Sequence, residues 1–263
     1  MNHPDVERPT DEPIMAGMAT VPSREDALGD AIHSLLHQVD VLGLYVAPGD
    51  WERVRTIEDA QHPCEIRTHY VEEAEHDDHG DAGKFWWAEE WDGYYLTVDD
   101  DIIYPPTYVA DTIEAIDTVG PRAAVSCHGV ILGEMPLDSY YRNRSVFHWQ
   151  REVRAFHQVH LACTGWAAFH TNHLDLSMED FPEPQMADIW FGIECQRAEL
   201  PAYVRPHPPS VNQIGPEDGY LTQNPKVDLS GSIYANHHRR DGLQTDTVNE
   251  FERTHGWQLP TST

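Results

Sequence analysis

Lysine is almost missing from this chain of 263 residues, in which only Lys84 and Lys226 are lysines. Lysine and arginine together number 17 against 45 acidic residues, and the formal net charge is −28 at pH 7. Binding to a nucleic-acid backbone needs a basic stripe that attracts phosphates, and the sequence shows none. The composition therefore argues against a nucleic-acid partner, and it disfavours anionic lipid surfaces.

Long apolar runs and paired cysteines are also missing. No segment approaches the ~20 apolar residues of a membrane span, and the polar N-terminus lacks the apolar region of a signal peptide. Cys64, Cys127, Cys163 and Cys195 have no C-x-x-C spacing, so they predict small core residues in a reducing compartment rather than a zinc site or a disulfide framework. We expect a cytoplasmic protein with no transmembrane segment, either free or peripheral at the inner face of the membrane.

What the sequence does contain is an alternation of strand and helix patterns. Strand patterns lie at 14–19, 41–47, 65–71, 94–98, 123–130, 159–170 and 201–205, and helical patterns lie at 23–36, 51–60, 84–91, 105–120 and 186–200. Such alternation is typical of βαβ units, and we expect an α/β fold with a mixed, mostly parallel central sheet flanked by helices. Ser23 and Asp26 predict a capping box at the first helix.

The chain divides into three expected parts. Residues 1–12 are polar and predict a flexible N-terminus, and residues 13–205 carry the alternating pattern of the domain. Residues 206–263 are rich in Pro, Gly, Asn and Asp, and predict a C-terminal tail that either packs on the domain as a lid or is loose. Residues 132–156 show no clean period and predict a loop-rich insertion around the site.

Asp99, Asp100 and Asp101 close the apolar run 94–98. Ligands of open α/β sheets bind outside the carboxyl ends of the strands, where clustered carboxylates suit Mg²⁺ or Mn²⁺. Most acidic residues of so acidic a chain belong to solvated surface, but this run follows a strand too apolar for a surface turn. Adjacent carboxylates also repel one another unless a cation or water screens them. The sequence therefore predicts a metal or ligand site at this position.

Four segments occur in a characteristic order: ATVPSR at 19–24, GDAGKF at 80–85, the triple aspartate, and MADIWF at 186–191. Together they resemble a family-2-type glycosyltransferase of the glycosyltransferase A fold, over about residues 13–205. The resemblance implies a single Rossmann-like domain of that type. It also implies a nucleotide-diphosphate sugar donor, with a UDP-sugar favoured, and a glycan, lipid-linked or protein-linked acceptor. Mn²⁺ or Mg²⁺ is the implied cofactor.

The resemblance also assigns roles to residues. The implied donor contacts are Thr20, Pro22, Ser23, Arg24, Asp81, Lys84, Asp99 and Asp100. Asp99 and Asp101 would hold the metal, and a C-terminal histidine, His237 or else His207, would complete its shell. Asp188 would be the general base of a single, inverting displacement, since a base there takes the proton of the attacking hydroxyl.

Other interpretations of these residues stay open. Asp188 suits a helix start without any chemistry, and Ala187 stands where the family often has a second acid, which leaves Glu183 and Glu194 as other candidates. The tryptophans Trp166 and Trp190 suit either sugar stacking or plain packing. His128 follows a strand and is a candidate to face the site.

Two other classes of function compete with a glycosyltransferase. A metal-dependent phosphoester hydrolase would also need clustered Asp and His, as in the run His76–His79. A catalytically inactive sugar- or nucleotide-binding protein of the same fold would keep the same residues. A sugar-nucleotidyl transferase is close in fold, but it needs a Gly-rich, Arg-containing phosphate loop that residues 20–23 do not provide.

The acidic composition resembles that of proteins from salt-in halophiles and leads to a stability prediction. Concentrated salt screens the self-repulsion of a surface with a net charge of −28. We expect the melting temperature to rise when dilute buffer is replaced by molar KCl, as followed by circular dichroism. An unchanged melting temperature would contradict this.

Overall fold

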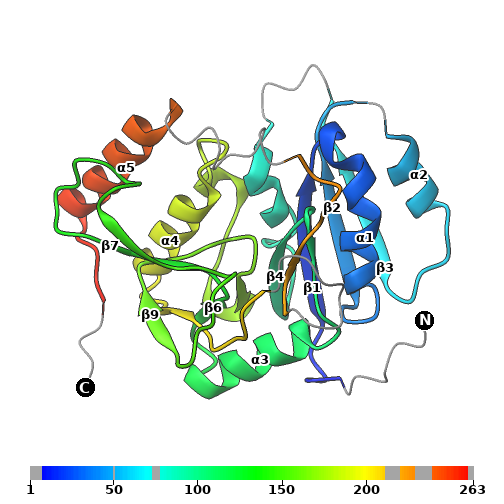
Figure 1. Ribbon diagram of the computed structural model, residues 1–263, viewed down its shortest axis with the longest axis horizontal. Helices are drawn as coiled ribbons and strands as arrows, with labels where there is room; N and C mark the ends of the chain where they lie inside the picture. The colour runs from blue at the N-terminus through cyan, green and yellow to red at the C-terminus, as the bar shows by residue number, and fades with distance from the viewer. Residues whose placement is uncertain (1–7, 50, 73–77, 211–219, 229–238, 260–263) are drawn as a thin grey trace.

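The computed structural model describes residues 8–49, 51–72, 78–210, 220–228 and 239–259 (Figure 1). Its centre is an eight-stranded sheet in the order β3-β2-β1-β4-β11-β6-β12-β9. The strands are β1 (Ile14–Thr20), β2 (Val41–Val46), β3 (Glu65–Tyr70), β4 (Tyr94–Asp99), β6 (Ala124–Ser126), β9 (His157–Val159), β11 (Ala168–His170) and β12 (Ala202–Val204). Pairing is parallel from β3 to β4 and between β6 and β12, and antiparallel on both sides of β11 and at β9. The predicted mixed, mostly parallel α/β architecture is confirmed.

Helices and short strands complete the fold. The α-helices are α1 (Glu25–Leu35), α2 (Glu52–Glu58), α3 (Tyr108–Val119), α4 (Ala187–Arg197) and α5 (Asp241–Thr254). The 3-10 helices are η1 (Pro22–Arg24), η2 (Gly80–Phe85), η3 (Thr171–His173) and η4 (Met178–Asp180). The remaining strands are β5 (Ile102–Ile103), β7 (Gly129–Leu132), β8 (Arg144–Phe147), β10 (Leu161–Ala162) and β13 (Thr222–Gln223), with β10-β7-β8 forming a small second sheet. In Figure 1, α1 and α2 lie at one end of the molecule and α4 and α5 at the other.

Both faces of the main sheet are covered, which explains why its central strands are apolar throughout. Side chains alternate between the two faces along a strand. Ala16 and Met18 of β1 belong to the core that α1 and α3 share, whereas Met15 belongs to a second core with η2 and α4. The 3-10 helix η2 therefore lies on the face opposite to α1.

A glycine brings η2 close to the sheet. A Cβ atom at Gly17 would overlap the carbonyl oxygen of Lys84, and the Tyr95 hydroxyl donates a hydrogen bond of 2.7 Å to that same oxygen. Only a residue without a side chain leaves this space. Gly17 thus sets how near the backbone of Lys84 comes to the carboxyl ends of β1 and β4.

The C-terminal part of the chain returns to the domain. β13 pairs antiparallel with β5, directly after the triple aspartate, and the buried Leu221 precedes it. α5 buries Val248 and Phe251 in the same core as α1 and α3. The division at residue 205 stays a prediction.

Several local predictions are corrected. Ser23 lies inside η1, and neither η1 nor α1 has a side-chain cap, because Pro22 starts a 3-10 turn there instead. The helix expected at 84–91 does not form, because the 3-10 helix η2 begins earlier, at Gly80, and ends at Phe85, and turns follow it. The strand expected at 123–130 is split into β6 and β7, and the insertion at 132–156 contains β8.

Replacing Gly17 by alanine tests the close approach of η2. We expect Gly17→Ala to reduce the free energy of unfolding by about 1–3 kcal/mol, because overpacking forces the backbone of η2 away from β1. Chemical denaturation measures this. The control is Gly242→Ala in α5, where a Cβ meets nothing within 4 Å and is expected to be neutral or slightly stabilising. Equal effects of the two substitutions would contradict the prediction.

Candidate active site

The triple aspartate lies at the carboxyl edge of the sheet. β4 pairs with β1 so that Asp99 lies opposite Ala19. Because side chains alternate along a strand, Asp99 and Asp100 leave on opposite faces. Asp99 therefore lies on the face that η2 covers, and Asp100 lies on the face of α1.

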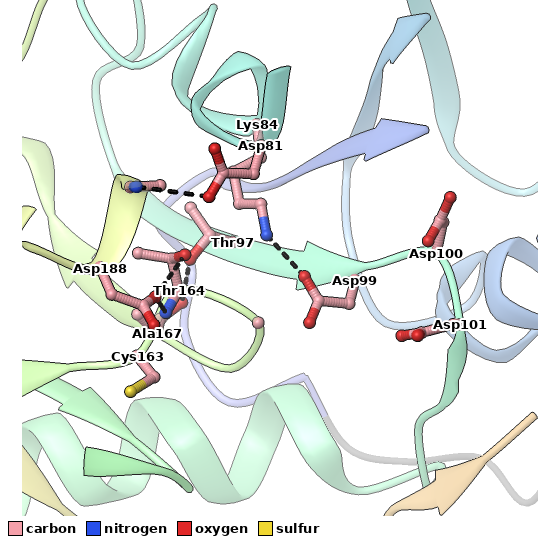
Figure 2. A network of polar contacts seen from close by, with 12 residues as sticks. Asp81, Lys84, Thr97, Asp99, Asp100, Asp101, Cys163, Thr164, Ala167 and Asp188 are labelled. Carbon is pink, nitrogen blue, oxygen red and sulfur yellow. Dashed lines mark hydrogen bonds and ion pairs between the residues drawn. The ribbon is translucent and has the colours of Figure 1, made fainter. Parts of the chain in front are cut away.

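Lys84 is the partner of Asp99. Its Nζ lies 2.5 Å from Asp99 Oδ1, and its side chain is only 5% exposed whereas that of Asp99 is 32% exposed (Figure 2). Burial lowers the pKa of Lys84, but the charges of Asp99, Asp81 and Asp188 outweigh burial and raise it. Lys84 is thus a buried, charged ammonium group that lies between the core and the more exposed carboxylate of Asp99.

Arg24 is the partner of the other two aspartates, Asp100 and Asp101. It forms an ion pair with Asp101 and lies 3.6 Å from Asp100, and the Thr20 hydroxyl donates a hydrogen bond of 2.7 Å to Asp100. Burial raises the pKa of Asp100 to about 7, although Arg24 opposes the rise. Pro22 and Ser23 are exposed beside this pair. The structure thus gathers the residues predicted at the end of β1 around the triple aspartate.

Asp81 links η2 to the start of α4. Its carboxylate oxygens accept hydrogen bonds from the backbone N–H groups of Gln185, at 2.5 Å, and Ala187, at 3.3 Å. A carboxylate at a helix N-terminus satisfies free N–H groups and interacts favourably with the helix dipole. Gln185 has a positive φ of 61°, an uncommon backbone for a residue with a side chain. Both oxygens of Asp81 are therefore engaged by the protein, and its predicted contact with a base stays a prediction.

Asp188 lies in the first turn of α4 and is held from outside the helix. Its Oδ1 accepts two hydrogen bonds from Thr164, one from the backbone N–H at 2.7 Å and one from the hydroxyl at 2.8 Å. The cap position belongs to Met186, so Asp188 is not the N-cap of its own helix. Cys163 lies beside it, and burial together with the charge of Asp188 raises the pKa of that thiol. In the view of Figure 2, Asp99 lies between Asp188 on the left and Asp100 and Asp101 on the right.

The loop between β10 and β11 joins the two carboxylates. The Tyr104 hydroxyl accepts a hydrogen bond from the Asp99 N–H and donates one to the Gly165 carbonyl, both 2.8 Å long. A Cβ at Gly165 would overlap the Asp99 carboxylate. Thr164 and Tyr104 are positioning residues that the sequence did not reveal. The only sequence signal was the bend expected at Gly165.

Glu183 and Glu194 are less suited to act as the base. Glu183 is exposed, and Glu194 forms an ion pair of 2.5 Å with Arg197 on its own helix. Neither is recorded in a contact with the loop that carries Thr164. Asp188 is therefore the one of these three acids that contacts that loop, whose Gly165 lies against Asp99.

No set of three His, Cys, Asp or Glu side chains close enough to hold a metal ion occurs in the ranges that the structure describes. Asp99 and Asp101 remain as two hard oxygen donors, and burial together with the charge of Asp99 raises the pKa of Asp101. Mg²⁺ is often held by one or two carboxylates together with substrate phosphates. The residues present therefore fit a cation shared with a diphosphate, and they do not fit a metal cage made by the protein alone.

The predicted histidines either have other contacts or lie outside the described residues. His237 lies outside the described residues, and so do His76 and Asp77. His207 is buried, with its ring nitrogens 2.9 Å from the carbonyl oxygens of Cys127 and Pro208. His128 is stacked on Trp166, with ring centroids 5.3 Å apart.

The two candidate tryptophans differ in setting. Trp166 directly follows Gly165, is 8% exposed, and stacks with Trp149 at 5.3 Å. Trp190 lies on α4 and lines a groove between α4 and α5, on the helix that carries Asp188. Their predicted contact with a sugar stays a prediction.

No protein-family model and no curated protein matches the chain. Among solved structures, residues 1–349 of TarS from S. aureus in complex with UDP are similar, with 11% identity, 92% of this chain and 72% of that chain covered, and a TM-score of 0.45. The inositol-1-phosphate CTP transferase of T. maritima has 9% identity, coverages of 90% and 96%, and a TM-score of 0.42. The 4-diphosphocytidyl-2C-methyl-D-erythritol synthase of Anaerococcus prevotii has 13% identity, coverages of 87% and 96%, and a TM-score of 0.43. With TM-scores below 0.5, these likenesses carry no argument about function.

Helices long and apolar enough to cross a bilayer are absent from the described part of the chain.

The pKa of Asp81 gives a prediction about pH. Burial raises this pKa from 3.8 to about 6, although Lys84 opposes the rise. Because the folded state holds the proton more tightly, the stability from this carboxyl is fully present below its unfolded pKa and is lost as the pH rises through about 6. In the parent protein we expect the free energy of unfolding to fall by about 2 kcal/mol between pH 4 and 7 as Asp81 loses its proton. The Asp81→Asn variant, which cannot titrate at this position, should lack this fall.

Denaturation at several pH values measures this slope. The control is Asp175→Asn, since Asp175 is exposed and its side chain forms no hydrogen bond or ion pair with the other described residues. An Asp81→Asn protein with the slope of the parent protein would show that Asp81 does not titrate in this range.

Proposed function

We propose that the protein is a glycosyltransferase that moves a sugar from a nucleotide-diphosphate sugar, with a UDP-sugar favoured, to an acceptor hydroxyl. The observation that carries this is the placement of Asp188. Thr164 occupies only one of its oxygens, and the next residue in that loop, Gly165, lies against Asp99. Asp188, which would meet the acceptor, and Asp99, which would meet the donor and its cation, thus contact neighbouring residues of one loop.

The donor side combines cations and carboxylates. Lys84 and Arg24 are each paired with an aspartate now, and each can exchange that partner for a phosphate oxygen. A divalent cation, Mg²⁺ or Mn²⁺, held by Asp101 and Asp99 would neutralise the charge that grows on the leaving diphosphate. Thr20 and the exposed residues Pro22 and Ser23 border this place and would contact the nucleoside.

The acceptor side depends on Asp188 and Thr164. Both donor groups of Thr164 bind Oδ1, so the carboxylate is held in one orientation. Asp188 would take the proton from the acceptor hydroxyl while that oxygen attacks the anomeric carbon and the diphosphate leaves. A single displacement of this kind inverts the configuration at that carbon.

Binding of nucleotides separates these roles. We expect UDP, or else GDP, to bind in molar KCl more tightly with Mn²⁺ than with a chelator, as measured by calorimetric titration. Asp101→Asn should reduce metal-dependent binding by at least about tenfold, because it removes a cation ligand. Asp188→Asn should leave binding unchanged and lower transfer by about 10²-fold or more.

The exposed Asp175→Asn serves as the matched control and should change neither quantity. If Asp188→Asn weakens nucleotide binding as much as Asp101→Asn does, the division of roles is wrong. Binding of neither nucleotide would overturn the transferase proposal. Hydrolysis of simple phosphomonoesters would instead identify the hydrolase.

A further inference from the structure

Arg144 is a cation that stacks on two aromatic rings and forms no ion pair with the residues that the structure describes. It begins β8, and its guanidinium carbon lies 4.4 Å from the ring centre of Tyr140 and 4.4 Å from that of Tyr141. Aromatic rings hold a guanidinium in place but accept none of its five N–H groups in the plane of the fork. Within the described ranges no ion pair or side-chain hydrogen bond of Arg144 is recorded. By contrast, Lys84 and Arg24 both have aspartate partners.

The two tyrosines are fixed by α5. The Tyr140 N–H donates to the Thr245 hydroxyl at 2.8 Å, and the Tyr141 N–H donates to Asp241 Oδ1 at 3.2 Å. The Ser139 hydroxyl donates to Asp241 Oδ2 at 2.7 Å. The start of α5 therefore holds this turn by three hydrogen bonds, and the stacked cation is presented by a rigid support.

Arg144 and Asp188 lie around the same groups. Burial and the charge of Asp188 raise the pKa of Cys163, whereas Arg144 lowers it. Tyr140 and Tyr141 also feel both charges with these opposite signs. The strand pairing agrees with this: β8, which begins at Arg144, pairs with β7, and β7 pairs with β10. The chain runs from β10 directly to Thr164, which binds Asp188, so the small sheet joins Arg144 to the candidate base.

A second unpartnered group lies next to this turn. Gln244 of α5 is only 4% exposed and interacts with the Tyr141 hydroxyl. Its Oε1 atom is buried and has no hydrogen-bond donor within the described residues. A buried acceptor without a donor is unfavourable unless a ligand or water completes it. An amide oxygen does not bind an anion, so the group that completes Oε1 would be a donor such as water or a hydroxyl of the acceptor.

We propose that Arg144 binds an oxyanion of the acceptor, so that the enzyme glycosylates an acidic acceptor, one that carries a carboxylate or a phosphate. This rests on the glycosyltransferase function proposed above. A protein of net charge −28 repels such an acceptor, and a local cation is needed to hold it. The planar fork of arginine matches the two oxygens of a carboxylate or phosphate.

The test compares two saccharides that differ in one charged group. Methyl glucuronide and methyl glucoside are titrated into the full chain, without nucleotide and with UDP, at one fixed ionic strength. We expect the glucuronide to bind about tenfold more tightly, which is the effect of one charge-assisted contact. Equal affinity for the two saccharides would overturn the proposal.

Variants assign the preference to Arg144. Arg144→Gln should abolish it, and Arg144→Lys, which keeps the charge but loses the fork, should retain part of it. The control is Arg142→Gln, because Arg142 carries the same charge two residues away but is exposed. A preference that survives in Arg144→Gln, or disappears equally in Arg142→Gln, would overturn the proposal.

Two further measurements separate this proposal from the function on which it rests. Inorganic phosphate should displace methyl glucuronide, and failure to compete would contradict an oxyanion site. UDP binding should be equal in the Arg144→Gln and parent proteins, since Arg144 belongs to the acceptor side. Loss of UDP binding in Arg144→Gln would place Arg144 in the donor site instead, whereas absence of both UDP and GDP binding in the parent protein would overturn the glycosyltransferase itself.

Discussion

Repulsion among three consecutive carboxylates is the constraint on which the site depends. The strand alternation at β4 sends Asp99 and Asp100 to opposite faces, and each face supplies its own compensation. Lys84 comes from η2 on one face, and Thr20 and Arg24 come from the end of β1 on the other. The apolar sheet makes these pairings strong, because burial of a charge is costly unless a partner is present. The core thus determines which side chains gather at its carboxyl edge.

A few contacts fix the relative positions of the elements that carry these charges. Gly17 sets the distance of η2 from the sheet, and Asp81 ties η2 to the start of α4. The loop at 163–167 then joins α4 to β4 through Thr164 and Gly165. Asp99 and Asp188 come from elements far apart in the sequence, and their relative position is fixed by these few contacts. A glycosyl transfer would need such fixed positions because its two reactants must meet in one orientation.

Much of the fold could be predicted from the alternation of strand and helix patterns, since the run before Asp99 is largely apolar and α1 has apolar residues at helical spacing. The residues of the site were also visible as acids and cations at strand and helix ends. Their pairings were not visible, because Asp81 meets Gln185 across 104 positions and Thr164 meets Asp188 across 24. α5 was missed for a similar reason. Its sequence is polar, and it is stabilised by contacts such as that of Thr245 with Tyr140, 105 positions away.

The pairing of β13 with β5 has a consequence for where the functional unit ends. The Asp101 carbonyl accepts hydrogen bonds from the Asn224 N–H at 2.8 Å and from the Gln223 amide at 2.9 Å. A segment that stops near residue 205 would contain every recognisable motif and would still leave this carbonyl, beside Arg24, without its two donors. The motifs and the contacts that hold Asp101 therefore end at different positions along this chain.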